Sequence, residues 1–404
     1  MSKAPVDPNS GQYLRFIGLD RGLHPDFGGE APNPPEIYGL PFVTVPGDQP
    51  LVPVAFVAYP GESDAGAPGR PPGYPIPDQA ITQPKWIEGG QPGSSAVGGD
   101  RHLLIVDRDH KILFELYQAH WNGEKDLWEA SSGAVFPLTS NLRRPEGWTS
   151  ADASGLAILP GLVRYDEVHG NTPIRHAFRC SVGATNGHVF PASHSAGSTV
   201  GALPLGARLR LKASVDISSF SPPVRRIFQA MKTYGLIVAD NGSDLYVQGT
   251  YDPRWDNDVL NPAFAALKAS DFEVIKLGWK PATTSSPGPC VSSQTTLCLG
   301  HGRFALSARW KTSEGQTGEA HAVSLGQESG YFWFFRSANL ELVVKVHNAC
   351  SAFGRYWVFV SALTNAGVDL TVMDTKTGET RDYTNPTGTR FSPIYDTDAF
   401  SGCP

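Results

Sequence analysis

The sequence predicts an all-β protein, with a jelly-roll-like β-sandwich main domain and a smaller C-terminal β-sandwich domain. Three observations lead to this prediction. The 404 residues include 43 Gly and 34 Pro, an excess that indicates many turns and few long helices. Apolar and polar residues alternate in short runs, as they do in half-buried strands. Gly, Asn and Asp separate these runs and favour the turns that join antiparallel strands.

Four segments of the chain differ in composition. Residues 1–52 carry scattered Pro, Gly and Asp, which predicts an extended N-terminal arm that packs on the main domain. Residues 53–280 hold most of the strand-like runs and form the predicted catalytic domain. The Pro-, Ser- and Thr-rich segment 281–289 predicts a linker. Residues 290–404 contain most of the cysteines and form the predicted accessory domain.

The main domain begins with a Pro- and Gly-rich stretch from Tyr59 to Asp100. A loop of this length is usually functional or disordered. One helix is expected near Ser221, because serine can cap a helix, Pro222 fits its first turn and apolar residues recur at helical spacing up to Gly235. A second short helix is expected over 261–271. The strand-like runs of this domain are HLLIVDRD, KILFELYQAHW, DLWEASSGAVFPL, GLVRYDEV, RHAFRCSV, GARLRLKASVDI, YGLIVAD and DLYVQGTY.

The C-terminal domain holds strand-like runs at regular spacing, from RFALSARWKT to VDLTVMDTKTGETRDYTN, which favours a sandwich. Cys290, Cys298, Cys350 and Cys403 lie in this part, and the sequence lacks the C-x-x-C pairs typical of zinc and redox sites. We therefore expect two disulfides in an exported protein, with the pairing left open. Cys180 is expected to be a small buried apolar residue.

Charge and hydropathy exclude several classes of partner. The net charge is −6 and Lys and Arg form no dense block, so we expect neither nucleic acid nor an anionic membrane surface as partner. The sequence has no run of about 18 apolar residues and predicts no membrane span. Its first residues lack the apolar region of a signal peptide. We expect a secreted, periplasmic or cell-surface protein whose signal peptide is not part of this sequence.

The chain contains the long strings GWTSADASGLAILPGLVRYDEV at 147–168 and YGLIVADNGS at 234–243. Together with other strings they resemble a family of uncharacterised exported bacterial proteins, and the resemblance covers about residues 50–277. The C-terminal strings SGYFWFF and YWVFVSALT are similar to an accessory domain at the ends of secreted bacterial proteins. The resemblance implies export, two domains and a carbohydrate-related or surface role.

Two segments combine carboxylates with aromatic side chains, as sugar-binding sites do. The first surrounds Trp148 and Asp152, and the second begins at Asp240. Hydrolysis of a glycosidic bond needs two facing carboxylates, one protonated and one ionised. We therefore predict a secreted glycoside hydrolase acting on a polysaccharide, with Asp152 and Asp240 as the preferred catalytic pair. Asp64 is a further catalytic candidate and Glu115 a reserve.

Other functions remain open at this point. A polysaccharide lyase would use His176 or Tyr246 as the base, with Arg208 or Lys212 holding the carboxylate of a uronate. A non-catalytic glycan-binding or surface-structural protein would need no facing carboxylates. No cofactor is expected, although His102, His176 and His194 could together bind a metal ion. The expected substrate-binding residues are Trp148, His102, His176, His194, Arg208, Tyr246 and Trp255.

Overall fold

The computed structural model describes residues 1–64, 71–139, 141, 143–280, 289–401 and 403. The chain divides into two compact units, residues 1–280 and 281–404. The structure is built mostly from strands arranged in several sheets, so the all-β prediction is confirmed. The expected linker at 281–289 lies outside the described residues, apart from Pro289.

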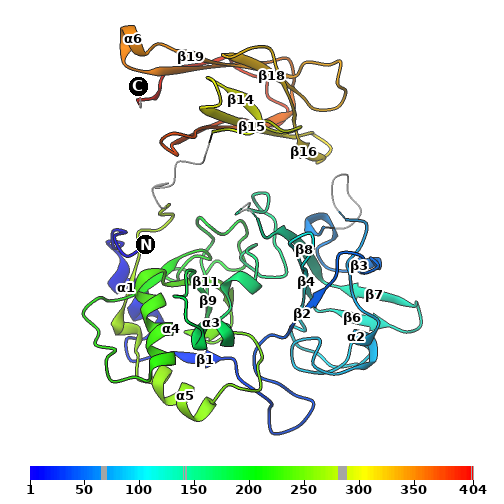
Figure 1. Cartoon of the computed structure of the whole chain (residues 1–404), viewed down its shortest axis with the longest axis vertical. Helices are drawn as coiled ribbons and strands as arrows, with labels where there is room; N and C mark the ends of the chain where they lie inside the picture. Colours follow the sequence, from blue (N-terminus) through cyan, green and yellow to red (C-terminus); the bar gives the residue numbers. More distant parts are fainter. Residues whose placement is uncertain (65–70, 140, 142, 281–288, 402, 404) are drawn as a thin grey trace. The chain divides into compact units, whose positions relative to one another are not determined.

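The largest sheet of the first unit has six strands in the order β1-β12-β9-β11-β10-β13. Helices α1, α4 and α5 cover one face of it (Figure 1), and their apolar side chains share one core with this face of the sheet. The strands are β1 (His24–Asp26), β9 (Phe178–Val182), β10 (Arg208–Leu211), β11 (Leu236–Asn241), β12 (Tyr246–Gln248) and β13 (Phe272–Val274). The helices are α1 (Ser10–Ile17), α4 (Pro222–Thr233) and α5 (Asn257–Ala265).

Helix α4 forms where the sequence predicts it. Its apolar residues recur at helical spacing, so Val224, Ile227, Phe228 and Met231 all face the sheet and are buried. Gly235 follows the helix with a φ of 76°, a conformation that glycine adopts without steric cost. The second expected helix is found as α5, which begins and ends earlier in the chain than predicted.

Two smaller sheets lie beside the large one (Figure 1). A four-stranded sheet has the order β2-β4-β5-β8 and a three-stranded sheet the order β3-β7-β6. Both contribute to a core that includes Tyr74, Phe114 and Trp128. The strands are β2 (Phe42–Val45), β3 (Val54–Phe56), β4 (Leu103–Asp107), β5 (Ile112–Tyr117), β6 (His120–Asn122), β7 (Leu127–Ala130) and β8 (Ser132–Pro137).

Three local expectations differ from the structure. The segment 1–52 is not simply extended, because it contains α1 and supplies β1 and β2 to two sheets. The run GLVRYDEV contains a short helix, α3 (Tyr165–His169), where we expected a strand. The stretch 59–100 contains the 3₁₀ helix η1 (Pro60–Glu62) and α2 (Gln79–Thr82), and it buries Tyr74, Ile76 and Ile87. Other short 3₁₀ helices are η2 (Leu159–Gly161) and η3 (Ala269–Asp271).

The second unit is a sandwich of two sheets that share one core. One sheet contains β14-β15-β21-β22 with β16 paired to β15, and the other has the order β17-β18-β19-β20-β23. The elements are β14 (Leu297–Leu299), β15 (Phe304–Lys311), β16 (Thr317–Glu319), β17 (His321–Ser324), β18 (Ser329–Trp333), β19 (Leu342–Asn348), α6 (Cys350–Phe353), β20 (Tyr356–Ala362), β21 (Gly367–Asp374), β22 (Thr380–Asn385) and β23 (Ile394–Phe400).

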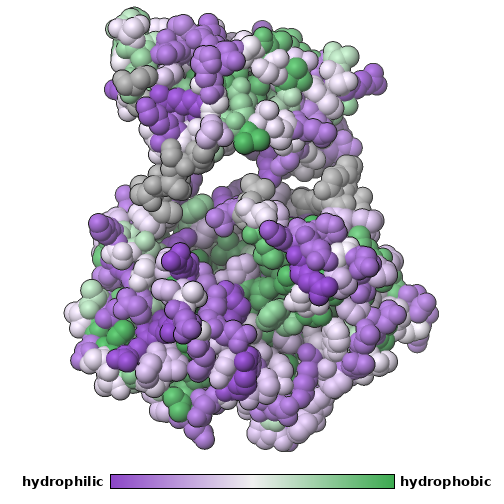
Figure 2. Space-filling model, viewed as in Figure 1, coloured by the Kyte–Doolittle hydropathy of each residue, from purple (hydrophilic) through white to green (hydrophobic). Residues whose placement is uncertain are grey.

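Two disulfides cross-link this unit, Cys290–Cys298 and Cys350–Cys403. Cys180 is a buried thiol in the first unit, and burial raises the pKa of its thiol to about 12. Among the described residues, no helix is long and apolar enough to cross a membrane. In the view of Figure 2, hydrophilic residues are spread over the surface of both units, with smaller apolar areas between them.

Candidate functional site

The face of the large sheet opposite the helices is polar. Along β9, Phe178, Cys180 and Val182 belong to the apolar core, so Arg179 and Ser181 project from the other face because side chains alternate along a strand. On the neighbouring strand β12, Tyr246 pairs with Ser181 and Val247 with Cys180. This register places Gln248 beside Arg179 on the polar face.

A β-bulge in β11 determines where Asp240 points. Val238 pairs with Cys180, but the next pair is Asp240 with Ser181, so Ala239 is the extra residue. In a regular strand, Asp240 would project from the same face as Leu236 and Val238, into the apolar core. The bulge moves it to the polar face, beside Arg179. Bulges are frequent next to active sites because they redirect a side chain in this way.

The loop 148–155 supplies Asp152. Ser150 Oγ accepts a hydrogen bond from Asp152 N at 2.9 Å and donates to the carbonyl oxygen of Leu156 at 2.6 Å. Ser154 N donates to the carbonyl oxygen of Ala239 at 3.0 Å, which ties the loop to the bulge in β11. The hydroxyl of Ser150 thus holds the loop backbone, while the carboxylate of Asp152 faces the sheet.

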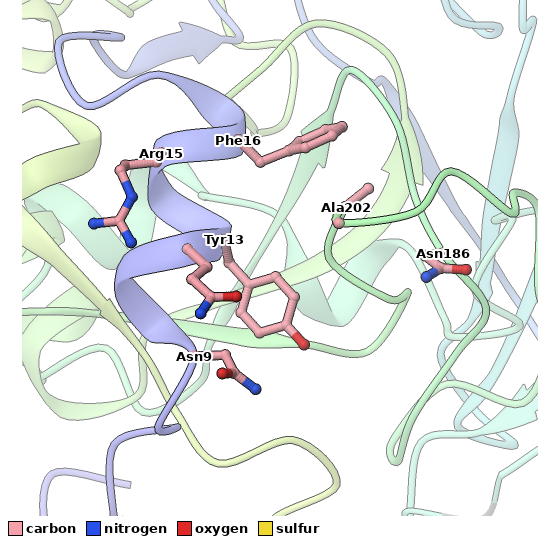
Figure 3. A pocket seen from close by; sticks show the side chains of 8 residues that line it. Asn9, Tyr13, Arg15, Phe16, Asn186 and Ala202 are labelled. Carbon is pink, nitrogen blue, oxygen red and sulfur yellow. The ribbon is translucent and has the colours of Figure 1, made fainter.

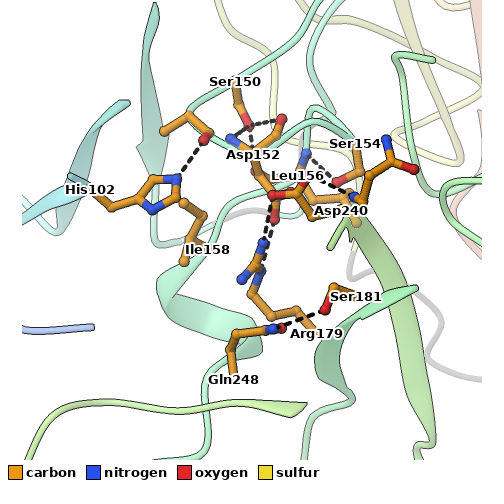
Figure 4. A network of polar contacts seen from close by, with 12 residues as sticks. His102, Ser150, Asp152, Ser154, Leu156, Ile158, Arg179, Ser181, Asp240 and Gln248 are labelled. Carbon is orange, nitrogen blue, oxygen red and sulfur yellow. Dashed lines mark hydrogen bonds and ion pairs between the residues drawn. The ribbon is translucent and has the colours of Figure 1, made fainter. Parts of the chain in front are cut away.

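Arg179 joins Asp152 and Asp240 (Figure 4). Its Nε donates to Asp152 Oδ2 at 3.0 Å, and its Nη2 donates to Asp240 Oδ2 at 3.4 Å. The side chain of Asp152 is 0% exposed and that of Asp240 is 27% exposed. The two carboxylates therefore lie side by side on one guanidinium, one enclosed and one open to solvent.

The two carboxylates differ in their electrostatic surroundings. Burial and the nearby charge of Asp152 together raise the pKa of Asp240 to about 6, and Arg179 opposes the shift. The positive charge of Arg179 also lies against Asp152, at 3.0 Å. A protonated carboxyl group next to an ionised one is the arrangement that acid–base catalysis by two carboxylates requires.

His102 connects the loop to a third acid. Its Nδ1 lies 2.6 Å from Glu88 Oε2, and its Nε2 lies 3.0 Å from the carbonyl oxygen of Ala151. Although burial opposes the charged imidazole, Glu88 holds the pKa of His102 up at about 9. A protonated His102 donates from both ring nitrogens and fixes the backbone that precedes Asp152.

Glu115 and Tyr117 of β5 complete the surroundings. Glu115 is 0% exposed and accepts hydrogen bonds from the backbone N–H groups of Ile158 and Leu159. Burial raises the pKa of Glu115 to about 7, against these hydrogen bonds. Burial and the charges of Asp100 and Asp240 together raise the pKa of Tyr117 to about 12. Acidic groups thus outnumber the cations Arg179 and His102 at this site.

Two buried acceptor atoms at the site have no hydrogen-bond partner among the described residues. They are Asp152 Oδ1 and Gln248 Oε1. Gln248 Nε2, by contrast, donates to Asp26 Oδ2 at 3.2 Å. A buried acceptor without a donor costs about 1–3 kcal/mol. Hydroxyl groups of a ligand or water molecules would satisfy both atoms.

The remaining catalytic candidate, Asp64, is not part of this cluster. It is 3% exposed and pairs with Arg144 Nη1 at 2.5 Å, while its Oδ2 also accepts from Val135 N. Asp64 therefore has the contacts of a structural ion pair.

Trp148 is half-buried in the loop that holds Asp152, and the guanidinium of Arg144 lies 5.3 Å from its ring centre.

The other predicted binding residues are dispersed. Tyr246 lies on the polar face opposite Ser181, two residues along β12 from Gln248, and its ring lies 4.3 Å from that of His24. Arg208 Nη1 contacts the sulfur of Met1 at 3.6 Å. Trp255 is 8% exposed and packs on Phe27 at 4.9 Å.

The three predicted metal-binding histidines have separate partners. His102 pairs with Glu88, His176 Nε2 lies 3.0 Å from Glu167 Oε2, and His194 Nδ1 lies 2.9 Å from the carbonyl oxygen of Ala153. Within the described ranges of the chain, no three His, Cys, Asp or Glu side chains are grouped in a way that could hold a metal ion. The donor set for the metal-dependent alternative is not assembled.

Sequence reasoning missed Arg179, Glu88 and Gln248. A signal for Arg179 was present, because it stands between Phe178 and Cys180 in an apolar strand, where a charged residue needs a buried partner. Glu88 comes from the long loop 59–100 and gave no such signal.

A separate pocket of about 410 Å³ lies between α1 and residues 186–202. Tyr13, Arg15, Phe16 and Asn186 line it (Figure 3). No carboxylate is among its lining residues, so this pocket lacks the groups for acid–base catalysis by paired acids.

Comparison of the chain with protein-family models, curated proteins and solved structures finds no match. The function must therefore be inferred from the geometry of the site itself.

Proposed function

We propose that residues 1–280 form a carbohydrate-active enzyme that hydrolyses glycosidic bonds of a neutral polysaccharide. One observation carries the proposal: Asp152 and Asp240 come from distant segments and contact the same guanidinium in unlike environments. Such a pair can divide the roles of proton donor and ionised carboxylate.

Asp240 is the proton donor in this proposal. It is the partly exposed member of the pair, and its raised pKa keeps it protonated in mildly acidic solution. Asp152 is its partner: its charge raises the pKa of Asp240 and stabilises the positive charge that develops on the sugar ring. Both carboxylates contact one edge of Arg179, through Nε and Nη2.

The charge of the site favours hydrolysis over elimination. A lyase must neutralise the carboxylate of a uronate substrate, whereas here Glu88, Asp152 and Asp240 surround Arg179. The raised pKa of Tyr117 keeps its phenol protonated, so Tyr117 is not available to accept the proton in an elimination. Arg208 and Lys212, the cations suited to holding a uronate, contact Met1 and Ser270 instead.

A non-catalytic glycan-binding protein is the second candidate. The complete burial of Asp152 favours it, because a buried Asp–Arg–Asp arrangement can also serve stability alone. In that case the site would bind a glycan through Gln248, Tyr246 and Asp240 without cleaving it.

The second unit has a surface suited to an accessory role. A chain of ring contacts runs along the outer face of its second sheet. The ring centres of Phe353 and Trp357 are 4.8 Å apart, those of Trp357 and Phe359 are 6.1 Å apart, and those of Phe359 and Tyr395 are 6.1 Å apart. Phe353 is 65% exposed and Tyr395 is 73% exposed. The apolar faces of sugar rings pack well on such aromatic rows. We propose that this aromatic row holds the polysaccharide near the catalytic unit.

The disulfides support export of the protein. Such bonds form and persist in oxidising compartments, and both bonds of this chain lie in the second unit. We therefore propose that the protein acts outside the cytoplasm, where polysaccharides are found.

The deciding experiment is product analysis on a panel of neutral and acidic polysaccharides. We expect the wild-type protein to release reducing ends from a neutral member. Asp240→Asn should lower the rate by about 10²–10⁴-fold, because it removes the proton donor. Asp252→Asn is the matched control, since Asp252 also pairs with an arginine, Arg254, but lies outside the site.

Three outcomes would contradict parts of this proposal. Glycan binding without cleavage would favour the second candidate. Release of unsaturated uronates would indicate a lyase. Equal losses in Asp240→Asn and Asp252→Asn would show that the pair is structural.

A further inference from the structure

A cavity of about 560 Å³ lies next to the candidate site, between segments 31–38 and 88–101. This volume falls within the range of small-molecule sites. Its lining combines a tyrosine, amides, carboxylates and an arginine, namely Asn33, Glu36, Tyr38, Glu88, Gln91 and Arg101. Tyr38 is 47% exposed, so its ring is accessible from solvent.

Arg101 gives this cavity a buried donor without a partner. The residue is 4% exposed. Its Nε donates to the carbonyl oxygen of Ala119 at 3.0 Å, and its Nη2 donates to that of Pro92 at 2.9 Å. Its Nη1 has no partner among the described residues. The two backbone contacts fix the guanidinium, so Nη1 is held ready for an acceptor that the described residues do not supply.

The backbone at Arg101 is also unusual. Its φ is 45°, in the left-handed region that residues other than glycine rarely adopt. Such strain is concentrated at functional sites, where it holds a side chain in a required position.

The charges of the lining select the class of ligand. One guanidinium faces two carboxylates, Glu36 and Glu88, so an anionic ligand would be repelled on balance. A ligand rich in hydroxyl groups can accept from Arg101 and donate to the carboxylates. Its apolar face can pack on Tyr38.

Glu88 connects the cavity to the candidate active site. Both of its hydrogen bonds to His102 use Oε2, and His102 in turn contacts the carbonyl oxygen of Ala151, next to Asp152. Glu88 also interacts with the charge of Arg179. Glu88 therefore borders the cavity and also contacts residues of the candidate site.

We propose that this cavity is a distal subsite for one neutral sugar unit of the chain whose glycosidic bond lies at Asp240. The inference rests on the proposed function and specifies its substrate. The substrate is an oligosaccharide that extends beyond the two sugar units joined by the cleaved bond. Tyr38 supplies the stacking face, Arg101 Nη1 the hydrogen-bond donor, and Glu88 and Gln91 the remaining polar contacts.

The test measures binding of neutral oligosaccharides, from disaccharide to hexasaccharide, by titration calorimetry. An Asp240→Asn background keeps each oligosaccharide intact. We expect affinity to rise when the chain becomes long enough to reach the cavity. Tyr38→Ala should weaken binding of the longer chains about tenfold and leave the shorter ones unchanged. Gln91→Ala is a second variant, which leaves the backbone contacts of Arg101 intact.

Phe42→Ala is the matched control. Phe42 is 43% exposed, lies four residues from Tyr38 and does not line the cavity, so binding should not change. The inference is overturned if Tyr38→Ala and Gln91→Ala leave the affinity of long chains unchanged, or if no neutral oligosaccharide binds. Preferential binding of acidic oligosaccharides would also overturn it.

The test separates this inference from the proposed function. If the wild-type protein cleaves nothing but Tyr38→Ala still weakens binding of long chains, the hydrolase proposal fails and the subsite stands. If cleavage occurs and Tyr38→Ala has no effect at any chain length, the subsite fails and the hydrolase proposal stands.

Discussion

Asp152 and Asp240 lie side by side because both accept a hydrogen bond from Arg179, at 3.0 and 3.4 Å. The loop that holds Asp152 is also anchored to Ala239, the residue before Asp240. The two carboxylates are thus connected by a side-chain bridge and by a backbone bridge. Neither can move far without affecting the other.

The first prediction concerns the pH dependence of activity. Asp240 must be protonated to act, and its pKa is raised to about 6, so kcat/KM should fall as the pH rises above about 6. Asp152→Asn removes a negative charge that holds this pKa up, so the residual activity should decline at a lower pH. A pH–rate profile of both proteins checks this. If the activity of the variant declines at the same pH as that of the wild type, or at a higher pH, the assigned effect of Asp152 on the pKa of Asp240 is contradicted.

The second prediction concerns Glu115 and stability. Burial raises its pKa from 4.5 to about 7 in the folded protein, so the folded state binds more protons than the unfolded state between these values. The resulting stability is present below pH 4.5 and is lost as the pH rises through 7. Relative to Glu115→Gln, the wild type should lose about 3 kcal/mol across this window.

Urea unfolding of both proteins at several pH values measures this difference. Parallel stability curves for the wild type and Glu115→Gln would show that Glu115 does not titrate in the window. Glu88→Gln is unsuitable as a control, because Glu88 belongs to the site.

The third prediction ranks the two disulfides. Cys350–Cys403 closes a loop with a sequence separation of 53, and Cys290–Cys298 one of 8. A longer closed loop restricts the unfolded chain more, so removal by paired Ser substitutions should cost about 4 and about 2.5 kcal/mol, respectively. Thermal unfolding of the second unit within the full chain would test the ranking. A larger loss for the Cys290–Cys298 pair would refute it.

The fourth prediction concerns the aromatic row of the second unit. Trp357→Ala or Tyr395→Ala should weaken binding to an insoluble neutral polysaccharide about tenfold, because stacking area is lost. Leu325→Ala is the control, since Leu325 is 62% exposed and lies outside the row. Sedimentation binding assays with the full chain measure the effect, and equal binding by all variants would exclude the row as a glycan surface.

Much of the architecture could be predicted from local patterns. Alternating apolar residues identified the strands, and the helical spacing of Val224, Ile227 and Met231 identified α4. The run GLVRYDEV misled this reasoning, because Tyr165 stacks on His169 within the short helix and packs on Trp255 from a distant segment. Local propensity is a weak guide where packing competes with it.

The candidate site depended on features that no local pattern contains. Arg179 contacts Asp152 and Asp240, which lie 27 and 61 residues away in the sequence. Glu88 reaches the site from a long loop whose path is set by burial of Tyr74 and Ile87.

By itself the sequence determined that the chain is rich in strands, that its cysteines gather in the second unit, and that Asp152 and Asp240 stand in polar segments beside strands. Only the tertiary structure decided that these two carboxylates meet. The physical reason is the bulge at Ala239: a single extra residue turns Asp240 out of the apolar core, where strict alternation would place it, and onto the charge of Arg179.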